Sequence, residues 1–283
     1  DRTIMSKTVA QAFLAKVYAE KEVQDYDKVI EYADKVIKTN GVGLEDDFET
    51  LWGYDETAKD CLKRNTKEGI LEVHWTTGGG NWETWMYGRQ LDNWDYYFTW
   101  AKWITPSRDL INDFEKEGDE VRKNQSIVYY ACTWSNYYPA SNYPFMYKLR
   151  SSYNNEYWVR LADIILMKAE AEAYKGNLSE SASLVNQIRK RAKLQDLTAD
   201  KTSNKEAMIE AVLHERRLEL ALEGERWFDL VRNNKVEEYL NGIDNRDSGR
   251  IKQQKTFDSN SYLLPIPQTA LDQNSNLQQN PGY

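Results

Sequence analysis

Five carboxylates crowd one short stretch of this chain, where side chains of that type could act as acid and base. They are Glu215, Glu219, Glu223, Glu225 and Asp229. A glycoside hydrolase needs two carboxyl groups facing one cleft, one of them with a raised pKa. Arginines at positions 216, 217, 226 and 232 lie nearby in sequence, and an arginine partner lowers the pKa of a carboxyl group. The pattern favours internal ion pairs, with a hydrolase of unfamiliar helical fold as the alternative.

The other reactive side chains form no recognisable catalytic or metal-binding pattern. His74 and His214 are far apart in sequence, and neither has a second ligand three or four residues further on, as a zinc site would require. The glycines at 78–80 lack the Lys and Ser or Thr that end a phosphate-binding loop. No Ser, Cys and His constellation indicates a nucleophile. We therefore expect neither a cofactor nor a metal.

Aromatic side chains are the strongest candidates for contact with a ligand. Residues 82–97 read WETWMYGRQLDNWDYY, so rings alternate with amide, carboxylate and guanidinium groups. An aromatic ring stacks on the flat C–H face of a sugar, while polar groups bond its hydroxyl edge. We predict a glycan-binding platform formed by some of Trp82, Trp85, Tyr87, Trp94 and Tyr96. The alternative is that these rings pack the loops against one another.

Composition narrows the class of protein. The 283 residues include 37 Lys and Arg against 45 Asp and Glu, for a net charge of −8. An acidic chain is a poor match for nucleic acid or an anionic membrane surface, and no apolar run is long enough to span a bilayer. The chain also carries 10 Trp and 19 Tyr, more than a core of this size needs. Two cysteines are too few for a disulfide framework.

Apolar residues recur at helical spacing in six segments, which pair along the chain into three helical hairpins. The pairs are 9–20 with 26–38, 158–174 with 178–192, and 203–222 with 227–240. Short polar connections predict antiparallel packing within each pair. The hairpins resemble tetratricopeptide-type repeats, although the strict repeat consensus is absent. The predicted fold is therefore mostly α.

Capping residues set the predicted helix ends. Asn177 and Glu180 have the spacing of a capping box, and so do Ser203 and Glu206. Gly224 is the predicted stop of the fifth helix.

The segment between the first two hairpins differs in character. Residues 41–157 hold most of the Trp and Tyr, have poor helical periodicity except at 107–117, and include a β-like stretch at 70–73. Long ordered loops inside a compact domain are usually functional. The chain thus divides into a helical hairpin at 1–40, a loop-rich aromatic insert at 41–157, and helical pairs with a loop-like tail at 158–283.

Four blocks in the last part resemble, in order, the motifs of the SusD/RagB family. They are RLADIILMKAEA at 160–171, NQIRKRA at 186–192, ERRLELALEGERWFDLVR at 215–232, and LPIP at 264–267 with QNPGY at 279–283. Two departures are peripheral: Leu161 stands where an aromatic residue is usual, and residues 269–275 lack the family's common Glu and Asn-Pro. The chain is identified as a member of that family.

The resemblance implies a surface-exposed lipoprotein of the Bacteroidetes outer membrane that binds a nutrient, usually an oligosaccharide, without catalysis. It implies delivery to a SusC-like TonB-dependent transporter, over which the lipoprotein sits as a lid. It also implies that the three parts form one SusD-like domain, whose N-terminal half and N-terminal lipid anchor are absent from this chain, and that Tyr283 lies near the natural C-terminus. A peptide or other non-glycan nutrient, or a helical-repeat adaptor for proteins, stays open. We expect no nucleic acid partner.

Overall fold

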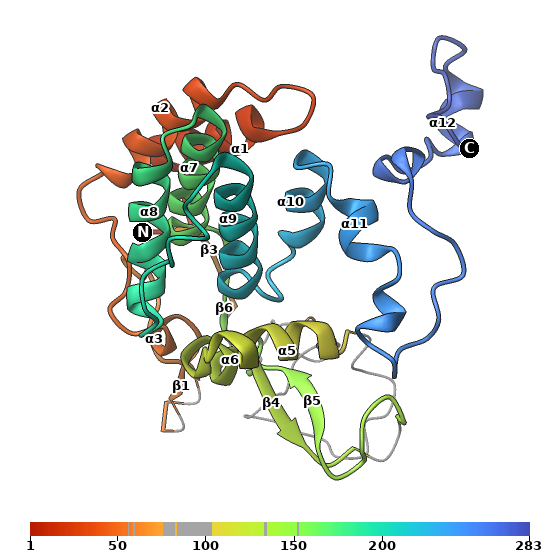
Figure 1. The fold of residues 1–283 in the computed structure, drawn as a ribbon. Coiled ribbons are helices and arrows are strands. Elements are labelled where there is room, and N and C mark those ends of the chain that lie inside the picture. Colours follow the sequence, from red (N-terminus) through yellow and green to blue (C-terminus); the bar gives the residue numbers. More distant parts are fainter. Residues whose placement is uncertain (56, 59, 76–82, 84–103, 133–134, 152) are drawn as a thin grey trace.

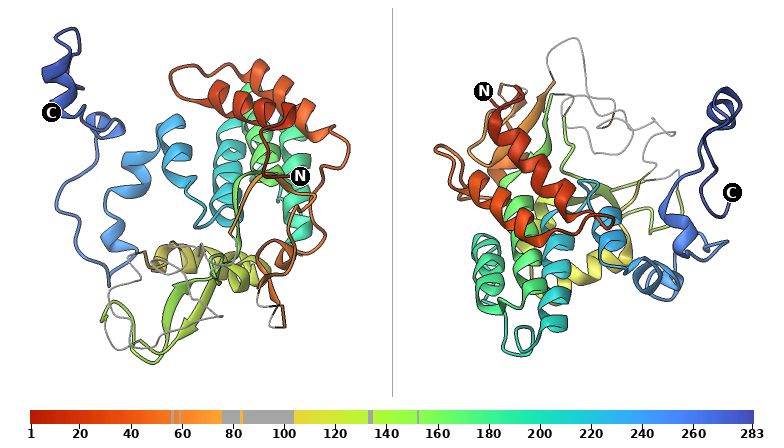
Figure 2. Two further views of the ribbon diagram at one scale, coloured as in Figure 1. Left: turned by 180° about the vertical axis from the view of Figure 1, so that it is seen from behind. Right: turned by 90° about the horizontal axis from the view of Figure 1, so that it is seen from above.

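The computed structural model describes residues 1–55, 57–58, 60–75, 83, 104–132, 135–151 and 153–283. Helices dominate this part of the chain, so the prediction of a mostly α fold is confirmed. The longer helices lie side by side in the upper part of Figure 1, and a layer of short helices and strands lies beneath them. The two termini lie at opposite sides of the molecule (Figures 1 and 2).

The first hairpin packs α1 (Lys7–Ala19) against α2 (Tyr26–Ile37). The side chains of Ser6 and Asp25 each accept a backbone N–H in the first turn of the helix that follows. Such caps satisfy donors that have no partner inside the helix. The hairpin packs on α7 through buried alanine and valine side chains, whose small size lets the helix axes approach closely.

The second hairpin joins α7 (Leu161–Lys175) to α8 (Leu178–Arg191), and it differs from the prediction at two points. Residues 158–160 belong to the strand β6 (Asn155–Arg160), so the helix begins later than predicted. The predicted capping box is wrong: Asn177 makes no capping hydrogen bond, and its side-chain amide instead donates to Glu172 at 2.7 Å. The left-handed Gly176 (φ 85°) ends α7 as a glycine after a helix commonly does.

The third helical pair is shorter and more broken than predicted. Helix α9 spans Lys205–Glu219, and its cap is Asn204 rather than Ser203. The next predicted helix is two pieces, α10 (Arg226–Arg232) and α11 (Val236–Leu240), separated by the left-handed Asn234 (φ 55°).

In the part of the chain that the structure describes, the second layer also contains three antiparallel strand pairs. They are β1 (Tyr54–Asp55) with β2 (Asp60–Cys61), β3 (Gly69–His74) with β6, and β4 (Ile127–Tyr130) with β5 (Tyr143–Met146). The β3 strand lies where the sequence predicted β structure. The described residues of the same region also form three short helices: α3 (Glu49–Trp52), α5 (Arg108–Glu117) and α6 (Glu120–Ser126). The predicted helix at 107–117 is α5, with Ser107 as its cap.

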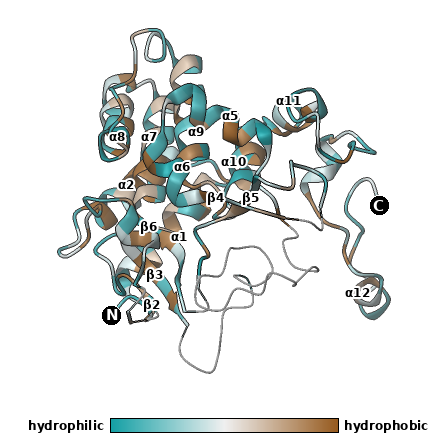
Figure 3. Ribbon diagram, turned by 90° about the horizontal axis from the view of Figure 1, so that it is seen from below, coloured by the Kyte–Doolittle hydropathy of each residue, from teal (hydrophilic) through white to brown (hydrophobic). Residues whose placement is uncertain are grey.

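Helix α7 is the centre of the molecule. Twelve of its residues are buried, and it contacts α1, α2, α8 and α9. In Figure 3, hydrophobic residues recur along the central elements, whereas α6 is hydrophilic over most of its length. Because α7 is buried on nearly every side, it has no exposed polar face. Its polar residues, described below, therefore need partners inside the protein.

The tail after α11 stands away from the helical layers (Figure 2). It contains two short 3-10 helices, η1 (Ile243–Asn245) and η2 (Ser259–Tyr262), and the helix α12 (Gln268–Gln273), which the sequence did not predict. Its far end is held by polar contacts such as those between Gln279 and both backbone groups of Ile266, at 2.8 and 3.0 Å. None of the residues from 248 to 283 is buried.

Candidate functional site

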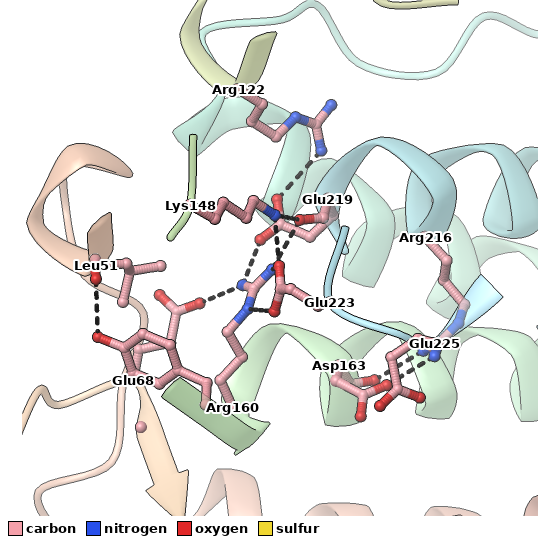
Figure 4. A network of polar contacts seen from close by, with 12 residues as sticks. Leu51, Glu68, Arg122, Lys148, Arg160, Asp163, Arg216, Glu219, Glu223 and Glu225 are labelled. Carbon is pink, nitrogen blue, oxygen red and sulfur yellow. Dashed lines mark hydrogen bonds and ion pairs between the residues drawn. The ribbon is translucent and has the colours of Figure 1, made fainter. Parts of the chain in front are cut away.

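The carboxylates of residues 215–229 lie at the core of a buried ion network. The Glu219 carboxylate lies between three guanidiniums: it accepts from Arg160 at 2.6 Å, from Arg122 at 3.2 Å, and from Arg191. All four side chains are 4% exposed or less. Glu68 from the insert joins them, 2.8 Å from Arg160 and 2.5 Å from Arg191. Figure 4 shows Arg160 reaching both Glu68 and Glu223.

Glu223 and Glu215 extend this network on either side. Arg160 donates twice to Glu223, at 2.7 and 2.8 Å, and Lys148 Nζ lies 2.5 Å from the same carboxylate. On the other side, Glu215 accepts from Arg189 at 3.1 Å. The partners come from β6, from α8 and from the insert, so the network ties three separate parts of the chain together.

A second cluster joins α7, α9 and α10. Arg216 donates to Asp163 at 2.7 Å and to Asp229 at 2.9 Å. Arg232 donates to Glu170 at 2.7 Å and to Asp229 at the same distance. All five side chains are 3% exposed or less. Only Asp229 among the five predicted carboxylates is therefore paired with arginines of its own motif.

The pKa values of these carboxyl groups shift in different directions. Burial alone would raise the pKa of Glu219, but Arg191, Arg160 and Arg122 outweigh it and hold that pKa well below its usual range. Arginine neighbours likewise outweigh burial and lower the pKa of Glu223 and Asp229. Glu225 is the exception: burial and then the charge of Asp163 raise its pKa, and it forms an ion pair with Lys16 at 2.8 Å.

A cavity of about 660 Å³ opens beside the first network. Its walls include three tryptophans, Trp52, Trp158 and Trp227, together with Tyr157 and Tyr239. Trp158 is 59% exposed, and the Trp227 ring is tilted against Phe257 with centroids 5.7 Å apart. These rings give the cavity the flat apolar surfaces on which a sugar face stacks.

Most of the charged side chains in the cavity wall form ion pairs within the protein. Arg217 pairs with Asp109 at 2.7 Å, and Lys148 pairs with Glu223. The pKa of Asp109 is lowered, since Arg217 and Arg246 outweigh the effect of burial. Among the wall carboxyls with a shifted pKa, Asp109, Glu223 and Asp229 are all lowered. None of these three suits the role of a general acid, which requires a raised pKa.

The predicted platform residues, Trp82, Trp85, Tyr87, Trp94 and Tyr96, lie outside the described residues. Glu83 is described and lines the cavity. Sequence reasoning did not select Trp158 and Trp227. The sequence predicts a helix that begins at Trp158, but residues 155–160 form a strand in which Trp158 is exposed and its neighbour Val159 is buried.

The two histidines serve as partners of carboxylates. His74 Nε2 lies 2.7 Å from Glu72, and His214 Nε2 lies 3.3 Å from Glu117. Within the described ranges, no group of three or more His, Cys, Asp or Glu side chains could hold a metal ion. Cys61 and Cys132 are not bonded to each other.

The described residues thus form helical hairpins around an ion-paired core, beside a cavity that aromatic rings line. Residues 144–283 match the model of the SusD family. SusD-like protein P2 of Formosa agariphila is 28% identical over 315 residues, which cover all of this chain and 60% of that relative. The chain belongs to the SusD family.

Solved structures agree on the fold. A SusD superfamily protein from Parabacteroides distasonis matches with a TM-score of 0.74 at 24% identity, over all of this chain and 64% of that one. A laminarin-binding SusD-like protein matches with a TM-score of 0.71 at 24% identity, over 99% of this chain and 63% of that one. The chain therefore spans less than two thirds of the length of each of these relatives.

Proposed function

We propose that this chain binds an oligosaccharide without transforming it. The observation that carries the proposal is the cavity of about 660 Å³, with Trp158 and Trp227 in its wall. A ring that is 59% exposed, as Trp158 is, loses contact with water when a sugar stacks on it. Burying aromatic surface in this way is a large favourable contribution to binding. The laminarin-binding relative supports the same class of ligand.

Polar groups beside the rings would orient the sugar. Glu83, Glu156 and Arg217 lie in the cavity wall with Trp158. Hydroxyl groups of a sugar donate to carboxylates and accept from guanidiniums, so this wall offers both kinds of partner. The predicted platform in residues 82–97 would add to the same site, and it remains part of the proposal.

The proposal that the protein does not catalyse a reaction rests on the ionisation of the carboxyl groups in the cavity wall. Cleavage of a glycosidic bond needs a carboxylic acid that is still protonated near neutral pH. The described wall carboxyls with a shifted pKa are held ionised by arginine or lysine neighbours. Glu225, whose pKa is raised, is not among the residues that line the cavity.

The family also supports a proposal for the cellular setting. We propose a lipoprotein at the surface of the outer membrane, held there by a lipid anchor, which passes its ligand to a SusC-like TonB-dependent transporter. The helices of the described residues include none long and apolar enough to cross a membrane. A lipid anchor would hold the protein at the membrane without such a helix.

Affinity electrophoresis against a panel of polysaccharides tests the ligand. We expect one polysaccharide to retard the chain, and we expect Trp158→Ala and Trp227→Ala to abolish most of the retardation. Trp82→Ala and Trp94→Ala test the predicted platform in the same gels. Phe228→Ala is the matched control, because Phe228 is a 53% exposed ring beside Trp227 in sequence that does not line the cavity.

Any longer protein that contains this chain needs the same test, since the chain spans only part of its relatives. Retardation unaffected by all four tryptophan variants would refute the aromatic site while leaving glycan binding intact. No retardation of either the chain or the longer protein would favour a peptide ligand or a protein partner. Release of reducing sugar during the assay would overturn the claim that the protein lacks catalysis.

A further inference from the structure

The wall of the cavity is more aliphatic than a platform for sugar rings alone requires. Leu, Ile, Met and Ala side chains outnumber the aromatic rings among the described lining residues. The insert, α11 and η1 supply most of them: Ile104, Leu110, Met146, Leu149, Leu240 and Ile243. Ile104 is 47% exposed, although it is a large aliphatic residue in this wall. Such side chains gain most from a ligand surface that is apolar as well.

The polar side chains of the wall are largely bonded within the protein. The Oγ of Ser107 accepts a backbone N–H of α5 at 3.1 Å, and the Nδ2 of Asn155 donates to a backbone carbonyl of the insert at 2.8 Å. The Tyr157 hydroxyl donates to a carbonyl of α3 at 3.2 Å. Asp109 and Glu223 are held in ion pairs. A sugar hydroxyl that leaves water for this part of the wall would replace few of its hydrogen bonds.

The charge of the wall separates neutral from anionic ligands. Carboxylates outnumber cationic side chains among the described lining residues. A sulfate or carboxylate on the sugar would therefore meet net repulsion. A neutral apolar group would not, and it would displace water from Ile104 and its aliphatic neighbours.

We propose that the oligosaccharide carries a small neutral apolar substituent, such as an O-acyl or O-methyl group, and that the aliphatic part of the wall recognises it. This inference rests on the proposed function, because it specifies the ligand of the same cavity. Trp158 stacks on the sugar ring, while Ile104 and its aliphatic neighbours cover the substituent. The substituent also replaces a hydroxyl for which this part of the wall has few partners, so it adds apolar contact and removes a desolvation cost.

Matched forms of the same polysaccharide test the inference. Xylan, glucomannan and laminarin are each prepared bare, partly O-acetylated and partly O-methylated, and affinity electrophoresis gives an apparent Kd for each form. We expect a substituted form to bind at least about fourfold more tightly than its bare form, the factor that burial of one methyl-sized group gives. A preference for the acetylated form alone would identify an acyl group, and a preference for both forms would identify any small apolar group.

Ile104→Ser tests the wall itself. Ile104 is 47% exposed, so the buried core stays intact in this variant. We expect the ratio of the two affinities, substituted over bare, to fall to less than about twofold. Ile251→Ser is the matched control, because Ile251 is 67% exposed and is not among the residues that line the cavity. Trp158→Ala should weaken the binding of both forms alike, since its ring contacts the sugar.

The outcomes separate this inference from the proposed function. Equal binding of substituted and bare forms, or tighter binding of the bare form, would overturn the inference and leave glycan binding intact. An Ile104→Ser chain that keeps the full preference would refute the role of the aliphatic wall. If no form of any polysaccharide in the set or in the wider panel binds, the proposed function fails and this inference fails with it.

Discussion

Glu219 stabilises the fold through buried ion pairs. Its carboxylate is 0% exposed and is shared by three arginines. Removing one partner of a buried ion pair leaves the others buried without compensation, which typically costs about 3–5 kcal/mol. We expect Glu219→Ala to lower the free energy of unfolding by about that amount or more, as measured by urea denaturation.

The matched control for Glu219 is an exposed ion pair. Glu238 lies 2.7 Å from Lys235 and its side chain is 61% exposed. Surface pairs contribute roughly 0–1 kcal/mol, so Glu238→Ala should change stability by less than about 1 kcal/mol. Equal losses from the two variants would refute the view that the buried network stabilises the fold.

Arg226 gives a second prediction at the scale of single residues. It is expected to matter more for folding than for ligand binding, although the described residues place no carboxylate within 4.0 Å of its guanidinium. It donates to the Leu213 carbonyl oxygen at 3.1 Å and lies 4.8 Å from the Tyr239 ring centroid. Losing one hydrogen bond from a charged donor and one cation–π contact costs roughly 2–4 kcal/mol.

The comparison for Arg226→Ala is Arg216→Ala. Arg216 is 0% exposed and bonds both Asp163 and Asp229, so its removal should cost more than the removal of Arg226. Chemical denaturation ranks the two, and gel retardation by the chosen polysaccharide measures binding. An Arg226→Ala chain that unfolds like the parent but no longer binds would contradict the structural role.

Among the elements, the turn from α9 to α10 is where backbone conformation decides the path of the chain. Leu222 and Gly224 both adopt left-handed conformations, with φ of 66° and 88°. A Cβ added to Gly224 would meet no atom within 4 Å, so only backbone strain opposes a side chain there. We expect Gly224→Ala to lower stability by about 1–2 kcal/mol, the cost of a left-handed L-residue, in a thermal unfolding series.

Gly43→Ala serves as the control for this turn. The added Cβ would approach the Lys67 side chain at 3.9 Å, an ordinary contact, and the position has no left-handed backbone. Replacing such a glycine reduces the entropy of the unfolded chain and is neutral to slightly stabilising, by up to about 1 kcal/mol. If both variants lose equal stability, backbone conformation is not the reason.

The same scale shows which elements a single sequence can predict. Periodic apolar spacing identified α1, α2, α5 and α8 within a few residues, because those helices bury apolar residues on one side. It also identified α7, whose apolar residues are buried around most of the helix. It failed at β6, where the apolar residues of a strand run directly into α7 and blur the boundary. It also missed α6, whose sequence EVRKNQS has almost no apolar residue and whose buried members are Arg122 and Ser126. That helix is positioned by ion pairs, which leave no periodic signal.

The candidate site was harder to predict for a related reason. Local sequence indicated that the carboxylates of 215–229 would be ion-paired, and they are. The sequence predicted nearby arginines as the partners, and for most of these carboxylates that was wrong. Arg160, for example, bonds both Glu219 and Glu68, which lies 151 positions before Glu219. The cavity likewise collects Trp52, Trp158 and Trp227 from three distant segments. Only the folded chain brings such residues together.

For the molecule as a whole, the buried network has a structural consequence. Arg122 comes from α6, Arg160 from β6 and Arg191 from α8, and all three bond Glu219 at the end of α9. The insert is therefore fastened to the helical pairs by these ion pairs as well as by apolar packing, in which Ile70 and Leu71 join the core of the helices. The cavity lies beside these bonds, which restrain its walls before a ligand binds and so limit the conformational entropy that the protein itself loses on binding.

That construction predicts how the whole protein responds to acid. Arginine or lysine neighbours lower the pKa of four buried carboxyls, those of Asp163, Glu219, Glu223 and Asp229. A group whose folded pKa lies below its unfolded value of about 4 stabilises the fold at any pH above that value. This contribution is lost as pH falls below about 4, because the unfolded chain then binds more protons than the folded one. We expect a flat urea midpoint from pH 8 to about 5 and a steep fall from about 4 to 3.

The pKa of Glu225 is shifted in the opposite direction, so this residue has the opposite effect on stability as the pH falls. Its folded pKa is raised above 4.5, so burying its charged form costs stability at neutral pH, and that cost disappears once the group is protonated in acid. Glu225→Gln should therefore be as stable as the parent or more stable at pH 7, and the two chains should converge near pH 3. Glu219→Gln should instead be less stable than the parent at pH 7, with the difference shrinking in acid. A parent chain that gained stability between pH 5 and pH 3 would show that these carboxyls are not held ionised in the fold.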